Sequence, residues 1–157
     1  MQIEYISVRE LRPYSNNART HSRKQIQQIA KSIEKFGFCN PVLVDDAKQI
    51  IAGHGRVEAA KLLGIDAVPT CQLSHLSDAE KRAYVLADNK LAEKAGWDRE
   101  LLAIELEGLI ELDVDIELTG FETAEIDLIL EDARETSGAS TGPEDTAPEP
   151  SLGPAVS

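Results

Sequence analysis

The chain has 157 residues, of which 42% are hydrophobic, so it can form one domain with a real core and an appendage. It has no run of about 18 apolar residues and no signal-like start, which argues against a membrane or secreted protein and favours a cytoplasmic one. Cys39 and Cys71 have no partner at metal-ligand spacing, and we interpret both as small core residues on or beside strands.

The formal charge of -12 is distributed unevenly along the chain. Residues 1–64 carry ten Lys/Arg against six Asp/Glu, residues 65–96 four against five, and residues 97–157 two against seventeen. Because the acidic part repels phosphate, any contact with DNA or nucleotide is expected in the first half. We interpret the acidic part as solvated helical faces followed by a disordered tail.

A strand and a capped helix are predicted first. Residues 3–8 are rich in strand-forming side chains, and residues 14–21 have the turn chemistry of a loop. Ser22 with Gln25 three positions later forms a capping-box pattern, after which apolar side chains on one face predict a helix that ends before Gly37.

A hairpin is predicted to lead the chain into a tight turn. Residues 42–44 and 49–51, which are apolar except for Gln49, flank a polar stretch of hairpin length, and the turn Gly53-His54-Gly55-Arg56 follows after Ala52. A helix then runs from Gly55 to Leu63. Unpaired N–H groups and partial positive charge at its start, the two glycines and the Arg56 guanidinium suit a bound phosphate, although the pattern alone also fits an ordinary turn.

Residues 67–73 predict a further strand, which Pro69 places near a sheet edge or starting late. These elements predict an α+β (mixed α/β) fold in which helices pack on a small sheet. Ser77 and Glu80 form a second capping box, which opens a long helix to about Ala95. This helix has four apolar residues at helical spacing, namely Ala83, Leu86, Ala87 and Leu91.

The later segments predict acidic helices and a tail. Asp98 can cap one helix, residues 118–121 form a break, and Thr123 can cap a last short helix. From Thr136 on, almost nothing can be buried, which predicts a disordered linker. The expected organisation is a domain at 1–96, a helical extension at 97–134 and a tail at 135–157. The expected apolar positions of the two helices are Leu102, Leu106, Leu109, Ile110, Ile126, Ile129 and Leu130.

The motifs of residues 3–96, taken in register, resemble the ParB N-terminal domain, also called the ParB-like nuclease domain, which shares its fold with sulfiredoxin. The likeness is carried by the N-N-A-R loop, F-G-F-x-N-P-V-L-V, I-I-A-G-H-G-R, A-A-K-L-L-G and L-S-x-A-E-K-R-A-Y-x-L-A-D-N-K-L. The later W-D-x-E-L-L and L-T-G-F-x-x-x-E-I-D segments resemble a branch found in phage or mobile-element proteins. In that branch the domain often precedes a DNA modification methyltransferase.

The resemblance implies a nucleotide site with Mg²⁺. The G-E-R-R-type turn that cradles the phosphates of CTP corresponds to Gly53, His54, Gly55 and Arg56, and the family's Q-P segment, near the base or ribose, to Asn40-Pro41. Its E-N pair, which helps hold Mg²⁺, corresponds to Asp88-Asn89, a carboxylate and an amide suited to that ion. Arg19 and His21 lie in a loop that the family places near this pocket. Gly55 replaces an arginine, which leaves ATP, another nucleotide or a nucleic-acid backbone open as the phosphate source.

Three classes of function follow. The first is a DNA-associated module that binds a nucleotide and hydrolyses it slowly or not at all. The second is a metal-dependent nuclease, for which His54 and Asp88, with Glu58, are the available catalytic groups. The third is a non-catalytic module that places a methyltransferase.

Two family properties are not expected here. Sulfiredoxin chemistry needs a cysteine where His54 stands, and the acidic helices after residue 96 lack the Lys and Arg of a DNA-reading helix-turn-helix. The oligomeric state, including a dimer, is left open.

Overall fold

A computed structural model describes residues 2–14 and 19–139. The chain divides into two compact units, residues 1–96 and 97–157. Residues 140–157, most of the predicted tail, lie outside the described residues. Within the described part of the chain, no helix combines the length and apolar character needed to cross a bilayer.

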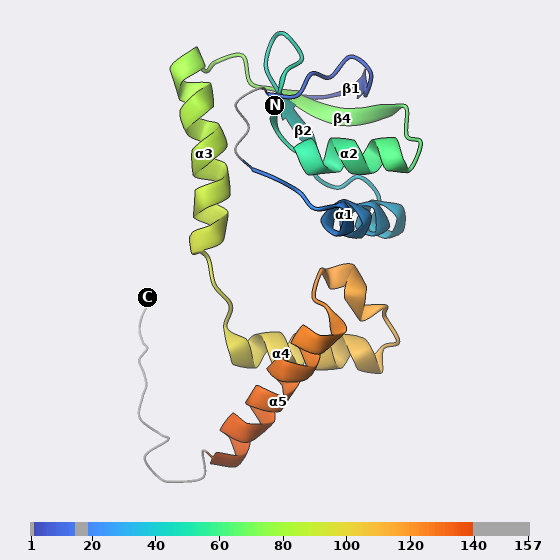
Figure 1. The fold of residues 1–157 in the computed structure, drawn as a ribbon, viewed down its shortest axis with the longest axis vertical. Helices are drawn as coiled ribbons and strands as arrows, with labels where there is room; N and C mark the ends of the chain where they lie inside the picture. The colour runs from blue at the N-terminus through green and yellow to red at the C-terminus, as the bar shows by residue number, and fades with distance from the viewer. Residues whose placement is uncertain (1, 15–18, 140–157) are drawn as a thin grey trace. The chain divides into compact units, whose positions relative to one another are not determined.

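The first unit is built on a four-stranded mixed sheet (Figure 1). Its strand order is β1 (Ile3–Ser7), β4 (Ala67–Gln72), β2 (Val42–Val44) and β3 (Ile50–Ala52). β1 pairs antiparallel with β4, β4 parallel with β2, and β2 antiparallel with β3 as the predicted hairpin. The predicted mixed α/β fold is therefore confirmed.

Pro69 lies in a central strand, so its predicted place near a sheet edge is wrong. Val8 N donates to Asp66 O at 2.9 Å, and the pairing Ile6↔Val68 follows in the same ladder. Hydrogen-bonded and non-hydrogen-bonded pairs alternate along two antiparallel strands, so Tyr5 and Pro69 form a non-hydrogen-bonded pair. The nitrogen of Pro69 therefore faces β2 rather than β1. The pairing of β2 with β4 begins only at Thr70, so the missing N–H of Pro69 removes no bond from the ladder.

Two helices form a layer on the sheet. α1 (Arg23–Phe36) begins at Ser22, whose side chain accepts from Gln25 N at 3.0 Å, and ends at Gly37 with φ of 86°. α2 (His54–Leu62) packs between the sheet and α1 (Figure 1). The core between sheet and helices consists of small and branched aliphatic side chains, among them Val42, Val44, Val57, Ala60 and Val68.

The two cysteines have different environments. Cys71 is buried in β4, as predicted. Cys39 is exposed, and its Sγ donates to Phe36 O at 3.2 Å, so the interpretation of Cys39 as a core residue is wrong. Cys39 lies in the loop between the end of α1 and the start of β2, rather than in a strand of the sheet.

α3 (Asp78–Lys94) begins with the predicted capping box, in which Ser77 Oγ accepts from Glu80 N and Glu80 Oε1 accepts from Ser77 N. The helically spaced set predicted on this helix does not pack, since Leu86 and Leu91 are 61% and 66% exposed. The residue that α3 buries is Val85. α3 therefore contacts the sheet along a narrow line.

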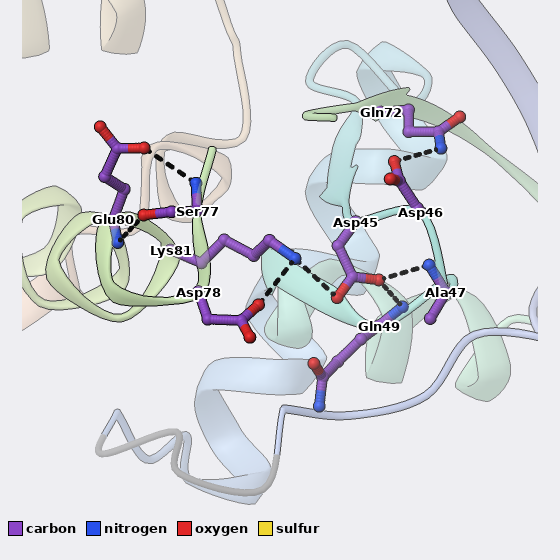
Figure 2. A network of polar contacts seen from close by, with 9 residues as sticks. All are labelled: Asp45, Asp46, Ala47, Gln49, Gln72, Ser77, Asp78, Glu80 and Lys81. Carbon is purple, nitrogen blue, oxygen red and sulfur yellow. Dashed lines mark hydrogen bonds and ion pairs between the residues drawn. The ribbon is translucent and has the colours of Figure 1, made fainter. Parts of the chain in front are cut away.

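A polar network ties the start of α3 to the turn between β2 and β3 (Figure 2). Asp45 is 6% exposed, and its Oδ1 accepts from Ala47 N and Gln49 N, each at 2.8 Å. Its Oδ2 lies 3.6 Å from Lys81 Nζ, which also lies 3.5 Å from Asp78 Oδ1. The Asp45 carboxylate thus accepts the hydrogen bonds of the β2–β3 turn and also forms the ion pair that links this turn to α3.

The second unit contains α4 (Arg99–Glu111), a short 3₁₀ helix η1 (Ile116–Thr119) and α5 (Thr123–Ala139). Asp98 caps α4 as predicted, accepting from Leu101 N at 3.2 Å. Thr123 is instead the first residue of α5, and its Oγ1 donates to Glu117 Oε2, so its predicted capping role is wrong. α5 has 17 residues and passes the predicted helix end near residue 134. The buried residues are Leu102, Ala103, Leu106, Ile126 and Ile129.

Candidate functional site

The turn between β3 and α2 has a backbone that requires glycine. Gly53 has φ of 106°, and a Cβ there would lie 3.0 Å from Arg56 Nη2 and 3.3 Å from Val42 Cα. A side chain at this position would therefore collide with both the guanidinium and the neighbouring strand. The turn leads directly into α2, whose first N–H groups have no partner within the helix.

The turn opens into a cavity of about 160 Å³. This cavity brings together side chains from the loop before α1, from the turn and from α3. Of the residues predicted for the site, Arg19, His21, Gly53, His54, Gly55, Arg56, Asp88 and Asn89 all line it, with Ile29 and Ile51 as apolar walls. Asn40 does not line this cavity and is exposed.

Arg56 is a half-buried cation with incomplete hydrogen bonding. Its Nη2 donates to Pro41 O at 2.9 Å, while its Nε is buried and has no hydrogen-bond partner among residues 2–14 and 19–139. Burial lowers the pKa of Arg56, and the negative charge of Asp88 opposes this shift. A buried guanidinium donor without an acceptor is costly, and an anion in the cavity would offset that cost.

His54 joins the turn to the N-terminal loop. Its Nε2 accepts from Tyr14 N at 3.2 Å, which places the proton of the neutral ring on Nδ1. Burial lowers the pKa of His54, the charge of His21 lowers it further, and Glu58 acts in the opposite direction. His54 is therefore held neutral, with one ring nitrogen already used in structure.

His21 occupies the space that a side chain at position 55 would need. A Cβ on Gly55 would lie 3.1 Å from His21 Cε1, 3.2 Å from His21 Nε2 and 3.0 Å from Ile29 Cδ1. The His21 ring is held by Gln25, whose Oε1 lies 3.1 Å from His21 Nδ1. The absence of a side chain at Gly55 thus allows an imidazole to reach the cavity.

α3 contributes the polar pair Asp88-Asn89. Asn89 Nδ2 donates to Val85 O at 2.8 Å, which leaves the amide oxygen as the atom available to a ligand. Arg19 Nη1 lies 3.4 Å from Glu93 Oε2, so the N-terminal loop also reaches α3. A second cavity, of about 350 Å³, shares Arg19 and Asn89 with the first. In the part of the chain that the structure describes, no three His, Cys, Asp or Glu residues converge to hold a metal.

Residues 1–90 match the family model of the ParB N-terminal domain. The chain belongs to the ParB N-terminal domain family. It is 51% identical over 82 residues to the ParB-like nuclease domain-containing protein YnaK of Escherichia coli K12, covering 52% of this chain and 94% of YnaK. It is 32% identical over 91 residues to stage 0 sporulation protein J of Bacillus subtilis, covering 55% of this chain but 32% of that protein.

A solved structure with the same fold is the C-terminally truncated chromosome-partitioning protein ParB of Caulobacter crescentus, complexed with CTP-γ-S. Its TM-score against this chain is 0.69 at 19% sequence identity, and the match covers 92% of this chain and 90% of the Caulobacter chain. At this identity the likeness shows the fold. The resemblance to ParB inferred from the sequence motifs is confirmed.

Residues 100–157 match the ParB-methyltransferase HTH domain, so a helix-turn-helix domain follows the ParB domain. The expectation that no DNA-reading helix-turn-helix follows concerns contact with DNA, and it stays a prediction. That expectation used charge as the criterion, whereas the motif is defined by how two helices pack around a turn. The described part of the match contains α4, η1 and α5, with Gly120, at φ of 90°, between η1 and α5. The match does not identify the molecule that this unit binds.

Some residues of the site carried no signal in the sequence. Tyr14 uses its backbone, and a backbone N–H can be supplied by any residue except proline. Ile29 was predicted as a core residue of α1, and Ile51 as a strand residue, yet both line the cavity. The sequence signal that pointed to this cavity was the glycine spacing of the turn, because glycine meets its backbone and space requirements.

Proposed function

We propose that this chain is a DNA-associated ParB-like module that binds the phosphates of a nucleotide, CTP or ATP, or of a nucleic acid at Gly53-His54-Gly55-Arg56. The observation that carries the proposal is the buried Nε of Arg56, which is close in the chain to the start of α2 and has no acceptor among the residues that the structure describes. Helix dipole, free N–H groups and a guanidinium favour the same anion. Arg19 and His21 add donors at the rim.

The size of the cavity supports a phosphate rather than a whole nucleotide as its occupant. At about 160 Å³ it is smaller than a typical small-molecule pocket of roughly 300–1,000 Å³. The nucleoside would then lie outside it. The ParB of Caulobacter crescentus, which has the same fold, is described in complex with CTP-γ-S, and this supports CTP as the first nucleotide to test.

Asp88 and Asn89 would hold Mg²⁺ together with the phosphates. A carboxylate and an amide oxygen are hard ligands, and Mg²⁺ usually takes only one or two protein ligands beside phosphate and water. Both residues line the cavity, and Asn89 has its amide nitrogen engaged with Val85 O. The ion would supply charge neutralisation for the phosphates.

The matched ParB-methyltransferase HTH domain supports an accessory role beside a DNA modification methyltransferase, or in a mobile-element protein. The alternative is a metal-dependent nuclease or a slow NTPase, which the description of YnaK as a ParB-like nuclease domain-containing protein supports. His54 and Asp88 remain its catalytic candidates. The tie between His54 Nε2 and Tyr14 N leaves only Nδ1 for chemistry, which favours the binding role.

The test is a titration of the four nucleoside triphosphates, with and without Mg²⁺, against wild type, Arg56→Ala and Asp88→Ala. We expect Mg²⁺-dependent binding that is weakened about tenfold or more in Arg56→Ala, since a charge-assisted bond is lost. Asp88→Ala should remove the Mg²⁺ dependence. Arg23→Ala, an exposed residue of α1, is the matched control.

Absence of binding by any triphosphate at millimolar concentration, in wild type, would refute the nucleotide proposal. The nuclease alternative is addressed with plasmid nicking in the presence of metal, using His54→Ala and Asp88→Ala. Nicking that persists in both variants would come from a contaminant.

A further inference from the structure

α4 is apolar on two opposite faces. One face packs against α5 through Leu102 and Leu106. The other carries Leu101 and Ile104, each 60% exposed, and Leu112, the residue directly after the helix, is 75% exposed on the same side. These positions recur at helical spacing and so share one side of the helix. A helix that is apolar on both sides is normally covered on both.

The exposed side of α4 continues into a groove between α4 and α5. This groove has a volume of about 300 Å³. Its floor is apolar and its edges are charged; it is lined by Glu100, Ala103, Ile104, Glu107, Leu130, Ala133 and Arg134. Ile104 therefore belongs both to the exposed face and to the groove. A helix laid there would pack against α4 and α5 together, as a third helix does in a small bundle.

The buried core of the second unit is small for a stable helical domain. In residues 97–139 it consists of five buried residues, with four partly buried ones packed against them. So small a core contributes little stability by itself. A third helix in the groove would enlarge it, and the ring contact of Trp97 with Phe121, with centroids 5.4 Å apart, lies in the same unit.

The charge around the groove indicates the chemistry of the occupant. Residues 97–139 contain fourteen Asp and Glu and two Arg. Glu100, Glu107 and Glu111 follow the exposed apolar face of α4 at helical spacing. Of the two arginines, Arg99 lies 3.5 Å from Asp132. Such a surface repels DNA and also a second copy of itself, and attracts a basic partner.

We propose that the α4–α5 unit is a protein-docking module, and that its groove binds an amphipathic helix of a partner protein whose apolar face is bordered by Lys and Arg. Ile104 and Leu101 contact the apolar face of that helix, and Glu100 and Glu107 contact its basic border. In this proposal only the first unit contacts nucleic acid. The helix-turn-helix of this chain thus recognises a protein.

The test uses the full chain and a fluorescently labelled helical peptide of Leu and Lys, with a Leu and Glu peptide of the same pattern for comparison. We expect the Leu/Lys peptide alone to bind. Ile104→Asp should weaken binding about tenfold or more, because it puts a charge in the apolar contact. Leu128→Asp is the matched control: Leu128 is 61% exposed on α5 and does not line the groove, so binding should be unchanged.

The acidic border is tested by a double variant, Glu100→Lys with Glu107→Lys, against Glu131→Lys with Glu135→Lys on the outer side of α5. Only the first pair should abolish the binding. Equal weakening by both pairs, or by Ile104→Asp and Leu128→Asp, would show binding by net charge and overturn the proposal.

Three other results would also overturn it. One is a wild-type dimer that Ile104→Asp converts to a monomer, which would make a second copy the occupant. Another is stronger peptide binding by a chain ending at Ala139, which would assign the groove to residues 140–157. The last is duplex DNA binding that Arg134→Ala abolishes. Trp97 fluorescence shows that each variant retains the fold of this unit.

Discussion

His54 combines a position in the cavity at the β3–α2 turn with a structural hydrogen bond, so its protonation affects both the fold and the candidate site. The ring accepts from Tyr14 N through Nε2, which only the neutral form can do. Protonation would therefore break the bond to the N-terminal loop and would add a positive charge beside Arg56 and His21.

We predict that His54 makes the stability of the first unit fall in mild acid. Its pKa is lowered in the folded chain by burial and then by His21, so the unfolded chain takes up this proton at higher pH than the folded chain does. Stability is fully present above the unfolded value of about 6.5 and is lost as pH falls below it. Urea midpoints at about pH 7.5 and about pH 5.5 should differ more for wild type than for His54→Asn.

Asn can still accept from Tyr14 N, which makes His54→Asn the suitable comparison. His75→Asn, at an exposed histidine, should keep the wild-type difference between the two pH values. An unchanged difference in His54→Asn would show that another group causes the acid sensitivity.

Among single residues, the sequence predicted those whose identity follows from a local backbone conformation or from a family motif. Gly53 and Arg56 were found because their spacing follows from the turn, and Asp88 and Asn89 because the family motif fixes their register. The hydrogen bond from Arg56 to Pro41 O joins residues 15 positions apart, and the one from Tyr14 N to His54 joins residues 40 positions apart. A local sequence pattern cannot predict contacts over such separations. The same holds for His21 over Gly55.

The position of α3 depends on a few contacts at its start, its middle and its end. Its start is held by Lys81 at Asp45, its middle by Val85, and the loop residue Arg19 contacts Glu93 near its end. Because α3 carries Asp88 and Asn89, the geometry of the proposed metal site depends on these anchors. The helix is otherwise largely exposed.

We predict that Asp45→Ala costs about 3 kcal/mol of unfolding free energy, because two backbone N–H groups and a lysine lose their buried acceptor. Lys81→Met should cost only about 1 kcal/mol, since the turn keeps both hydrogen bonds. Asp46→Ala, which removes an exposed bond from Gln72 Nε2, should cost less than about 1 kcal/mol. Chemical denaturation measures all three.

Hydrogen exchange separates the two functions of Asp45. Lys81→Met should increase exchange within the first turns of α3 and leave the β2–β3 turn protected, whereas Asp45→Ala should expose both. Equal costs for Lys81→Met and Asp45→Ala would contradict the prediction.

Element boundaries were predictable where a local cap sets them, as at Ser22, Ser77 and Asp98. Thr123 is not a cap because α5 begins at Thr123 itself, which leaves the cap position to the residue before it. The neighbours of each element were less predictable, because they depend on residues far along the chain. Pro69 shows this for β4, and Leu86 for α3, where helical spacing did not reveal that Val85 is the buried residue.

The chain has two compact units, each with its own core. We therefore expect a core mutation in one unit to change the unfolding free energy of that unit alone. Trp97, the single tryptophan, lies in the second unit against Phe121. Its fluorescence therefore reports on the second unit, while far-UV circular dichroism reports on both.

We predict that Leu106→Ala, at a residue 2% exposed, lowers the stability of the second unit by about 2–5 kcal/mol and leaves phosphate or nucleotide binding intact. Ile33→Ala, at a residue 8% exposed in α1, should destabilise the first unit by a similar amount and leave the Trp97 transition in place. Urea titrations followed by both signals, with binding measured in parallel, distinguish the two. A single shared transition in both variants would show that the units unfold together.

The central place of β4 determines when the first unit can fold as the chain is made. β4 is the last strand in the sequence, yet it joins β1 to β2: Ile3 pairs with Cys71, and Val42 with Thr70. A nascent chain that ends before residue 67 contains the β2–β3 hairpin as its only paired strands of the described sheet. The turn of residues 53–56 is then already synthesised, but the sheet that positions it is incomplete. Under the proposed function, phosphate binding would therefore begin only after β4 and α3 have emerged from the ribosome.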